Sequence, residues 1–416
     1  MMNNDLTADK KRRIIESGVV FTLLFFSNDT ILFGTNANGS FFWIQFIALI
    51  LLLFFLLIKN KTVTLRNLVV FFVFSILILV TLAFNSDFSI KYPYEIMMIL
   101  ISIMVVQFLP FETFKKMFCF WIEAFCLVAV FLFFIASFVS SLIGLLPIVV
   151  NETGINYHFA ILGIIEELGY SSLPRVYGIF REPGVFMVFI IIALLLETVL
   201  SDCFSIRRVL LYVIGLLLSF STAGYILLAV VFSLLIMKTI HHKKSKKQNK
   251  RFFFFLILAI LAAIILVCML GYDAINALVF NKLRVSNQSF DSRLGSIFGN
   301  INMFREKPLF GHGFSYFEDN FTYYASMSGY YEAHNTNTLF KILSVHGFFY
   351  FFFVLSGLFL LIKKNCKRLV IVLIAFMCFI LALSNEDLMV NTIIYVFVLY
   401  GFQPSKAIWY ENNQLF

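Results

Sequence analysis

Charged side chains are scarce in this chain of 416 residues: Asp, Glu, Lys and Arg together make up 13%, against 61% hydrophobic residues. A soluble domain carries about 25% charged residues and roughly 45–50% apolar ones. A water-soluble fold has no interior large enough for this much apolar surface. The composition therefore excludes a soluble globular enzyme and indicates a polytopic membrane protein.

Cysteine is infrequent as well, and the six residues are Cys119, Cys126, Cys203, Cys268, Cys366 and Cys378. None falls in the two long polar loops described below, so we expect no disulfide framework there. Their spacing also matches no metal-binding motif. The net charge of +9 does not require a nucleic-acid partner, because the positive charges lie between the apolar runs.

Long apolar runs are what the chain has in abundance, and a transmembrane helix needs about 20 such residues. Candidate spans cover residues 14–33, 41–58, 68–84, 94–109, 118–140, 184–202, 209–221, 223–238, 252–271, 339–362, 369–384 and 389–403. We expect the first run to be a retained helix, since no cleavage site follows it. The sequence therefore predicts an all-α polytopic membrane protein with about twelve transmembrane helices, forming one transmembrane domain over residues 1–416.

Residues 209–238 are long for one span and short for two, because a helix of that length covers about 45 Å. The Lys-rich run at 241–251 decides between them. Two short helices with an outer turn at 219–224 leave this run on the cytoplasmic side, where positive charge accumulates. Both termini are then cytoplasmic. The two long loops, 141–183 and 272–338, face outward into the periplasm.

Each outward loop contains a stretch whose apolar residues recur at helical spacing. In 292–307 these are Leu294, Ile297, Phe298, Ile301 and Phe304, and Pro308 ends the pattern. In 157–169 they are Phe159, Leu162, Ile165 and Leu168. We expect two amphipathic helices that lie on the membrane surface or pack over a cleft.

The first outward loop carries Arg175, Arg181 and Glu182 beside Gly178 and Pro183. The guanidinium group presents a fork of donors that matches phosphate. Outward arginines are also the minority under the positive-inside rule. The alternative is contact with lipid headgroups or an ion pair with Glu182. Glu182 itself is either a general base or the partner that fixes an arginine.

The second outward loop places His334 and Asn335 just before a span, after the tyrosines Tyr330 and Tyr331. Histidine is the usual acid–base side chain near neutral pH, and the tyrosines suit contact with sugar rings. Arg293 flanks the amphipathic stretch and either binds a second phosphate or only keeps the helix soluble.

Together these loops resemble the outer-loop motifs of the bacterial O-antigen polymerase and O-antigen ligase superfamily. The segments concerned are Arg175-x-x-Gly178-x-x-Arg181-Glu182-Pro183 and Arg293…Pro308-Leu309-Phe310-Gly311-His312-Gly313…His334-Asn335…Gly347. Members of this superfamily have about twelve spans and two large periplasmic loops, which agrees with the topology predicted above.

The resemblance implies a glycosyltransferase of the GT-C type in the bacterial inner membrane, acting in lipopolysaccharide biosynthesis without metal or cofactor. Its donor is a glycan on undecaprenyl pyrophosphate, and its acceptor is a second lipid-linked oligosaccharide. A chain-length regulator protein is a further candidate partner. By similarity, Arg175 and Arg181, helped by Arg293, hold the pyrophosphate. His334 or Glu182 deprotonates the acceptor hydroxyl, and Tyr330, Tyr331 and Asn335 contact substrate.

Polymerase and ligase differ in their acceptor. The spacing from His334 to Gly347 is longer than in the ligase pattern, which favours a polymerase. The alternatives are a ligase that transfers the glycan to lipid A-core, and a transporter or flippase of lipid-linked oligosaccharides. Transporters keep functional charges near the bilayer midplane, whereas the charges here gather in outer loops. The sequence identifies neither the sugar and linkage nor the oligomeric state.

Overall fold

The computed structural model describes residues 2–34, 40–60, 62–151, 154–166, 174–201, 204–241, 288–330 and 334–404. The described helices are α1 (Met2–Phe25), α2 (Ile31–Gly34), α3 (Ser40–Lys59), α4 (Leu65–Asn85), α5 (Lys91–Phe108), α6 (Phe111–Phe138), α7 (Ser140–Ile143), α8 (Pro183–Leu194), the π-helical segment η1 (Leu195–Val199), α9 (Ile206–Leu218), α10 (Thr222–His241), α13 (Gln288–Glu306), α14 (Phe314–Ser326), α15 (Thr338–Asn365), α16 (Leu369–Leu383) and α17 (Thr392–Phe402). A small antiparallel sheet accompanies them, with strands β1 (Ile148–Val150), β2 (Asn156–Ala160) and β3 (Gly163–Glu166) in the order β1-β2-β3.

Within the described residues, five helices are long and apolar enough to cross a membrane, namely α3 from Phe41, α4, α5, α6 and α15. Shorter apolar helices cover 183–199, 222–238, 369–383 and 392–402. The expectation of about twelve spans stays a prediction for the rest. The predicted span at 252–271, the basic run from 242 to 251 and loop residues 272–287 lie outside the described residues.

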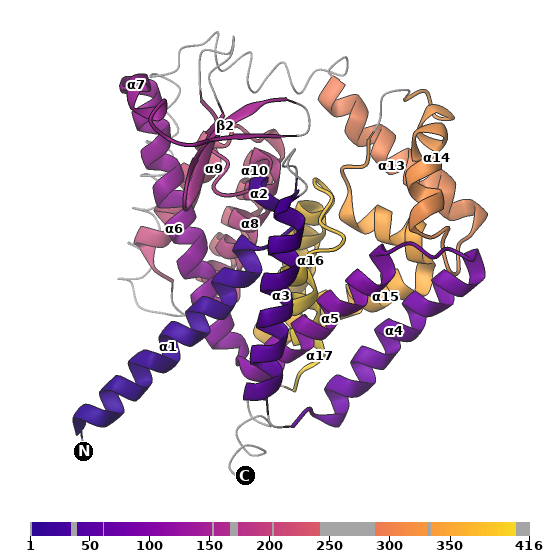
Figure 1. Cartoon of the computed structure of the whole chain (residues 1–416), viewed down its shortest axis with the longest axis horizontal. Coiled ribbons are helices and arrows are strands. Elements are labelled where there is room, and N and C mark those ends of the chain that lie inside the picture. Colours follow the sequence, from indigo (N-terminus) through magenta and orange to yellow (C-terminus); the bar gives the residue numbers. More distant parts are fainter. Residues whose placement is uncertain are drawn as a thin grey trace.

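The helices form a bundle in which every residue of α8 is buried, with α6, α9, α10 and α16 packed against it. The sheet, α13 and α14 lie at one end of this bundle, and α1 begins at the opposite end (Figure 1). At that opposite end Gln403, just after α17, donates a hydrogen bond to Asn67 of α4 (2.6 Å). We refer to the end that carries the sheet as the sheet end.

The segment 209–238 forms two helices, as predicted. Helix α9 ends at Leu218, a turn covers residues 219–221, and α10 runs back beside the preceding segment. Lys238 near the end of α10 donates hydrogen bonds to the carbonyl oxygens of Thr198 (2.8 Å) and Val199 (2.9 Å). The turn therefore lies at the sheet end, opposite these contacts.

The amphipathic helix predicted for 157–169 is wrong. Residues 156–160 and 163–166 form strands β2 and β3, and 167–169 lie outside the described residues. The apolar spacing fits a short helix or a short hairpin equally well. Long-range pairing decides, because His158 pairs with Ile148 of β1 and Ile165 bridges to Val176. The fold is therefore mostly helical with a small sheet, rather than all-α.

The first predicted span, 14–33, also ends early. Helix α1 stops at Phe25 and a turn precedes α2. In this turn the Ser27 hydroxyl accepts from the Asp29 backbone N–H (3.2 Å), and the Thr30 hydroxyl donates to the Ser27 carbonyl (3.0 Å). Such side chains offer the backbone local partners that compete with the helix. The break places Asp29 at the sheet end.

The amphipathic helix predicted for 292–307 is confirmed as α13, which begins earlier, at Gln288. The turn that follows docks onto a break in α15 at Gly347, whose φ is +78°. The backbone N–H groups of His312 and Gly313 donate to the carbonyls of Ser344 (2.9 Å) and Val345 (3.0 Å), which the break leaves without helical partners. Irregular backbone inside a membrane bundle is tolerated where protein satisfies it in this way.

Two glycines make this docking possible. A Cβ on Gly347 would lie 2.4 Å from the Leu309 carbonyl oxygen, and one on Gly311 would lie 2.3 Å from the Val345 carbonyl oxygen. Both glycines also have positive φ, which other residues adopt only with strain. The Pro308–Gly313 turn therefore holds in place the part of α15 that precedes Gly347, residues 338–346. This part of the helix reaches the candidate site.

Candidate functional site

Arg181 connects three segments at the sheet end. Its backbone N–H donates to the Asp29 carbonyl (2.9 Å), and its guanidinium forms an ion pair with the Asp29 carboxylate (3.6 Å). The same guanidinium donates to the Asp387 carbonyl (2.8 Å). Asp29 is buried, so this arginine supplies the counter-charge that a buried carboxylate needs.

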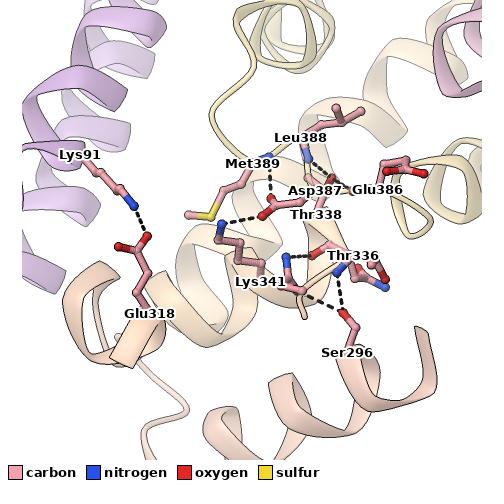
Figure 2. Close-up of polar contacts among 12 residues, drawn as sticks. Lys91, Ser296, Glu318, Thr336, Thr338, Lys341, Glu386, Asp387, Leu388 and Met389 are labelled. Carbon is pink, nitrogen blue, oxygen red and sulfur yellow. Dashed lines mark hydrogen bonds and ion pairs between the residues drawn. The ribbon is translucent and has the colours of Figure 1, made fainter. Parts of the chain in front are cut away.

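The connection between α16 and α17, residues 384–391, contains Asn385, Glu386 and Asp387, and we call it the acidic loop. Thr338, the first residue of α15, holds it through three hydrogen bonds, one of which its hydroxyl donates to the Glu386 carbonyl (2.5 Å). Its backbone N–H donates to the Glu386 carbonyl (3.0 Å), and its hydroxyl accepts from the Leu388 N–H (2.8 Å). One turn along, Lys341 pairs with the Asp387 carboxylate (2.6 Å; Figure 2). The first turn of α15 thus fixes the acidic loop.

The Glu386 side chain lies against the first turn of α8, where a Cβ on Gly184 would come 1.7 Å from its Oε1 atom. This carboxyl is 6% exposed. Burial raises its pKa to about 8, the negative charge of Glu182 adds to the effect, and the charges of Arg181 and Arg293 oppose it. A buried carboxyl of this kind holds a proton near neutral pH and can exchange it.

The neighbouring carboxyl of Asp387 behaves in the opposite way. Burial works to raise its pKa, but the ion pair with Lys341 and the nearby charge of Arg181 outweigh it and lower the pKa below its ordinary value. Two adjacent carboxyls therefore differ in protonation near neutral pH. Environments that separate the pKa values of paired carboxyls are typical of acid–base sites.

Arg293 reaches the same loop from α13. Its guanidinium donates to the side-chain oxygen of Asn385 (2.8 Å), one residue before Glu386. Together with Arg181 and Lys341 it makes three cationic side chains around the acidic loop. Arg181 and Arg293 therefore contact the same loop. Their role in binding pyrophosphate stays a prediction.

Asn335 is held by α13 rather than left open to solvent. Its side-chain oxygen accepts hydrogen bonds from Ser296 (3.1 Å) and Asn300 (2.9 Å). The Ser296 hydroxyl in turn accepts from the Thr336 backbone N–H (3.0 Å; Figure 2). Hydrogen bonding to Asn335 also lowers the pKa of Asp387. Asn335 is thus a bridge between α13 and the acidic loop.

His334 is exposed, and its Nδ1 atom lies 3.3 Å from the hydroxyl of Ser292. Ser292 directly precedes Arg293, so His334 and Arg293 share one region of α13. Tyr330 stacks in parallel on Phe298 of the same helix, with ring centroids 6.0 Å apart. Tyr331 lies outside the described residues.

Arg175 directly precedes Val176, which bridges to β3, and its charge acts on Tyr157, Tyr177 and Tyr225. Its guanidinium donates to the Ser219 carbonyl at 3.4 Å, and its buried Nε atom has no partner among the described residues. Burial raises the pKa of Tyr157 to about 12; Glu166 and Glu182 add to this, and the charge of Arg175 opposes it. Glu182, an exposed residue, therefore acts electrostatically on both Tyr157 and Glu386, which links the Arg175 region to the acidic loop.

Sequence reasoning missed the acidic loop, Lys341 and the role of Asp29. A signal was present, because Asn385-Glu386-Asp387 interrupts two apolar runs at a turn that the predicted topology places outside. Groups of three or more His, Cys, Asp or Glu residues arranged to hold a metal ion are absent from the described residues.

Residues 209–355 match a family model described as O-antigen ligase. The matched region includes α9, α10, α13, α14 and much of α15, and with them Arg293, His334 and Asn335. Comparisons with curated proteins and with solved structures gave no match.

Proposed function

We propose that this chain, a member of the O-antigen polymerase and ligase superfamily by the match over residues 209–355, is a polysaccharide polymerase. It transfers a growing glycan from undecaprenyl pyrophosphate to a hydroxyl of the next lipid-linked repeat unit. The reaction takes place on the periplasmic side of the bacterial inner membrane. The observation that carries this proposal is that Arg181, Arg293 and Lys341 all bind the acidic loop, through Asn385 and Asp387, on either side of the buried carboxyl of Glu386.

In the proposed reaction the acceptor oxygen attacks the anomeric carbon, and the bond from that carbon to the pyrophosphate oxygen breaks. The pyrophosphate leaves with the bonding electron pair, and direct attack inverts the anomeric centre. Arg175, whose Nε lacks a partner among the described residues, offers spare donors to this leaving group. Arg293 adds positive charge beside the acidic loop. Placing such donors where negative charge develops stabilises the transition state.

The acceptor proton needs a base. The sequence predicted His334 or Glu182 for this role, and the geometry adds Glu386 as the residue we favour. In its ionised form Glu386 takes the proton, and a pKa of about 8 suits proton transfer near neutral pH. Glu182 acts on it through charge, and Lys341 keeps the neighbouring Asp387 ionised.

The second candidate is the ligase reaction, because the matched family model carries that description. The same groups would then transfer the finished glycan to lipid A-core. The transporter alternative finds less support. Within the described spans, the Glu95 carboxylate and the His346 ring lie 2.9 Å apart, and the Tyr350 hydroxyl donates to Glu95 (2.7 Å), so these buried polar groups already have partners in the protein.

The test is an assay of the purified protein with a synthetic undecaprenyl-pyrophosphate-linked repeat unit, read on a gel. A product ladder from that single substrate supports the polymerase, and we expect Glu386→Gln and Arg175→Ala to abolish it. Transfer only to added lipid A-core would instead identify a ligase. Neither product would contradict both reactions and favour the transporter. The assay is repeated in EDTA, where loss of the ladder would contradict the metal-independent mechanism.

A further inference from the structure

The β2–β3 hairpin lies alongside helix α6 and not beyond its end. A Cβ on Gly163, the first residue of β3, would come 2.8 Å from Val128 Cγ1 and 3.0 Å from Leu132 Cδ1. Val128 precedes Phe138, the last residue of α6, by ten positions, which is about 15 Å of helix. The turn between the strands, residues 161–162, therefore lies beside the middle of α6, about 15 Å from its last residue.

Helix α6 is one of the five candidate spans, so depth along it is depth in the membrane. Towards the end of α6 away from the sheet, Glu112 pairs with Lys115 (2.8 Å). These charges indicate where α6 leaves the apolar region on that side. The level of Val128 lies between them and Phe138. A turn at this level is within the thickness of the bilayer.

The turn has the composition that such a position requires. Residues 159–165, Phe-Ala-Ile-Leu-Gly-Ile-Ile, carry no charge, and the chain has no charged residue between Glu123 and Glu152. Ile161 at the tip is 73% exposed and Leu145 nearby is 80% exposed. The two belong to one end of the sheet, since the Phe159 N–H donates to the Pro147 carbonyl (2.8 Å).

This apolar surface continues one that already faces lipid. On α6, Phe131 is 62% exposed, and Phe134 and Phe138 are exposed on the same helix. A water-facing surface this apolar would be a liability in a membrane enzyme's outer loop. Continuity with the lipid-facing side of α6 indicates acyl chains as its occupant, rather than a second protein.

The hairpin also meets the backbone requirement for entering the bilayer. Ala160 pairs with Gly163 across the turn. On its other side β3 bonds to the segment that carries Arg175 and Arg181, where the Ile164 N–H donates to the Gly178 carbonyl (2.7 Å). Backbone groups paired in this way tolerate an apolar medium. The inward side chain of Ile165 packs in a cluster with Leu132 and Ala136 of α6.

We propose that the β2–β3 turn is a re-entrant hairpin that enters the bilayer from the sheet side, with Ile161 in contact with phospholipid acyl chains. Because β3 bridges to Val176, the inserted hairpin fixes the depth of the loop that carries Arg175. That loop then lies near the level of the lipid headgroups. The proposal is independent of the transfer reaction and can be tested without it.

The experiment places the photoreactive residue p-benzoylphenylalanine at position 161 of the full chain. The protein is reconstituted in nanodiscs of phosphatidylethanolamine and phosphatidylglycerol, irradiated, and analysed by mass spectrometry. We expect a phospholipid adduct at position 161, as at the α6 control position, Phe131. The matched control is Met327, which is 61% exposed at the end of α14 between Ser326 and Ser328, and there we expect no adduct.

An adduct at position 131 without one at 161 would overturn the proposal. So would a cross-link from position 161 to a second copy of the chain, because it identifies a protein occupant. If the variant at position 161 does not fold, the probe is moved to Leu145 on the same end of the sheet. Absence of a lipid adduct at Leu145 would then overturn the proposal, and its presence would support it.

Discussion

The Oε1 atom of Glu386 occupies the space that a side chain at position 184 would need, 1.7 Å from a Cβ built on Gly184. The acidic loop therefore packs against the first turn of α8 where Gly184 has no side chain. The contact joins Gly184, in the first turn of α8, to the Glu386 carboxyl, which we propose as the base.

Gly184→Ala should displace the Glu386 carboxyl while leaving its chemistry intact. We expect transfer to fall about a hundredfold, as for a displacement of roughly 1 Å at a reacting centre. The measurement is the rate of ladder formation per folded molecule in detergent. Gly18→Ala is the control, because a Cβ on Gly18 meets nothing within 4 Å. Equal rates for the two variants would separate Gly184 from the reaction.

The rate should rise with pH through about 8, because the ionised form of Glu386 accepts the proton and its pKa is raised to about 8. Glu386→Gln should remove both the activity and this rise. A pH profile of the wild-type rate checks the expectation. A profile that is flat between about pH 6 and about pH 9 would assign the proton to another group.

The same carboxyl should make stability depend on pH. Its pKa is about 4.5 in the unfolded chain and about 8 when folded, so between these values the folded state binds more protons. The stability that Glu386 contributes is full below about pH 4.5 and is lost as pH rises towards about 8. Melting temperatures of wild type and Glu386→Gln should therefore diverge over this window, with the wild type losing more. Parallel curves would contradict the raised pKa.

Arg175→Ala and Arg181→Ala should fail in different ways. Arg181 forms an ion pair with the buried Asp29 and donates to the Asp387 carbonyl, so its removal leaves both groups without this partner and should destabilise the fold by about 3–5 kcal/mol. Arg175 makes one long hydrogen bond to Ser219 in the described residues. Its removal should abolish transfer and leave the melting temperature close to that of the wild type. Arg175→Lys, which keeps the charge without the fork, should be intermediate in activity.

Gly347→Ala should prevent docking of the Pro308–Gly313 turn, because the new Cβ meets the Leu309 carbonyl at 2.4 Å and the backbone there has positive φ. We expect little folded protein by size-exclusion chromatography. Gly329→Ala is matched in φ, at +88°, but its Cβ meets nothing within 4 Å. That control should lose only about 1–2 kcal/mol. Equal losses of stability in the two variants would show that backbone strain alone explains the need for glycine at position 347.

Glu95 and His346 should show strong coupling. The pair is fully buried, and Glu95 also accepts hydrogen bonds from Tyr350 and Tyr395. Glu95→Leu and His346→Leu should each be destabilising, because each leaves a buried partner unsatisfied. The double variant should be more stable than the sum of the two losses predicts. Additive changes in thermal unfolding would contradict the coupling.

Much of the helical layout could be predicted from the sequence, because spans and outward loops follow from apolar length and the position of charge. The α9–α10 pair and α13 were found in this way. The hairpin was not, since the spacing of Phe159, Leu162 and Ile165 fits both periods over so few residues. Pairing with Ile148 and Val176 decided it, and no local pattern contains that information.

Only part of the candidate site could be predicted from the sequence, for a similar reason. Arginines and a histidine in the predicted outward loops stand out against an apolar background, so the sequence singles out Arg181, Arg293 and His334, and their roles stay predictions. The acidic loop is short and lies between two late spans, and its importance comes from what it contacts. Thr338 and Lys341 fix it, and Glu386 gains its pKa only through burial beside α8. Composition cannot report burial that depends on distant segments.

Asn391, at the start of the last described helix, donates hydrogen bonds to Ser27 (2.9 Å) and Asp29, which lie more than 360 positions earlier. During synthesis the early helices therefore wait in the membrane with Asp29 and Arg181 already made and their partners not yet translated. The site closes only after the acidic loop, residues 384–391, has been translated. A copy that stops before the acidic loop would hold Arg181 and Arg293 without Glu386 and Asp387, and we expect it to be inactive in the proposed transfer.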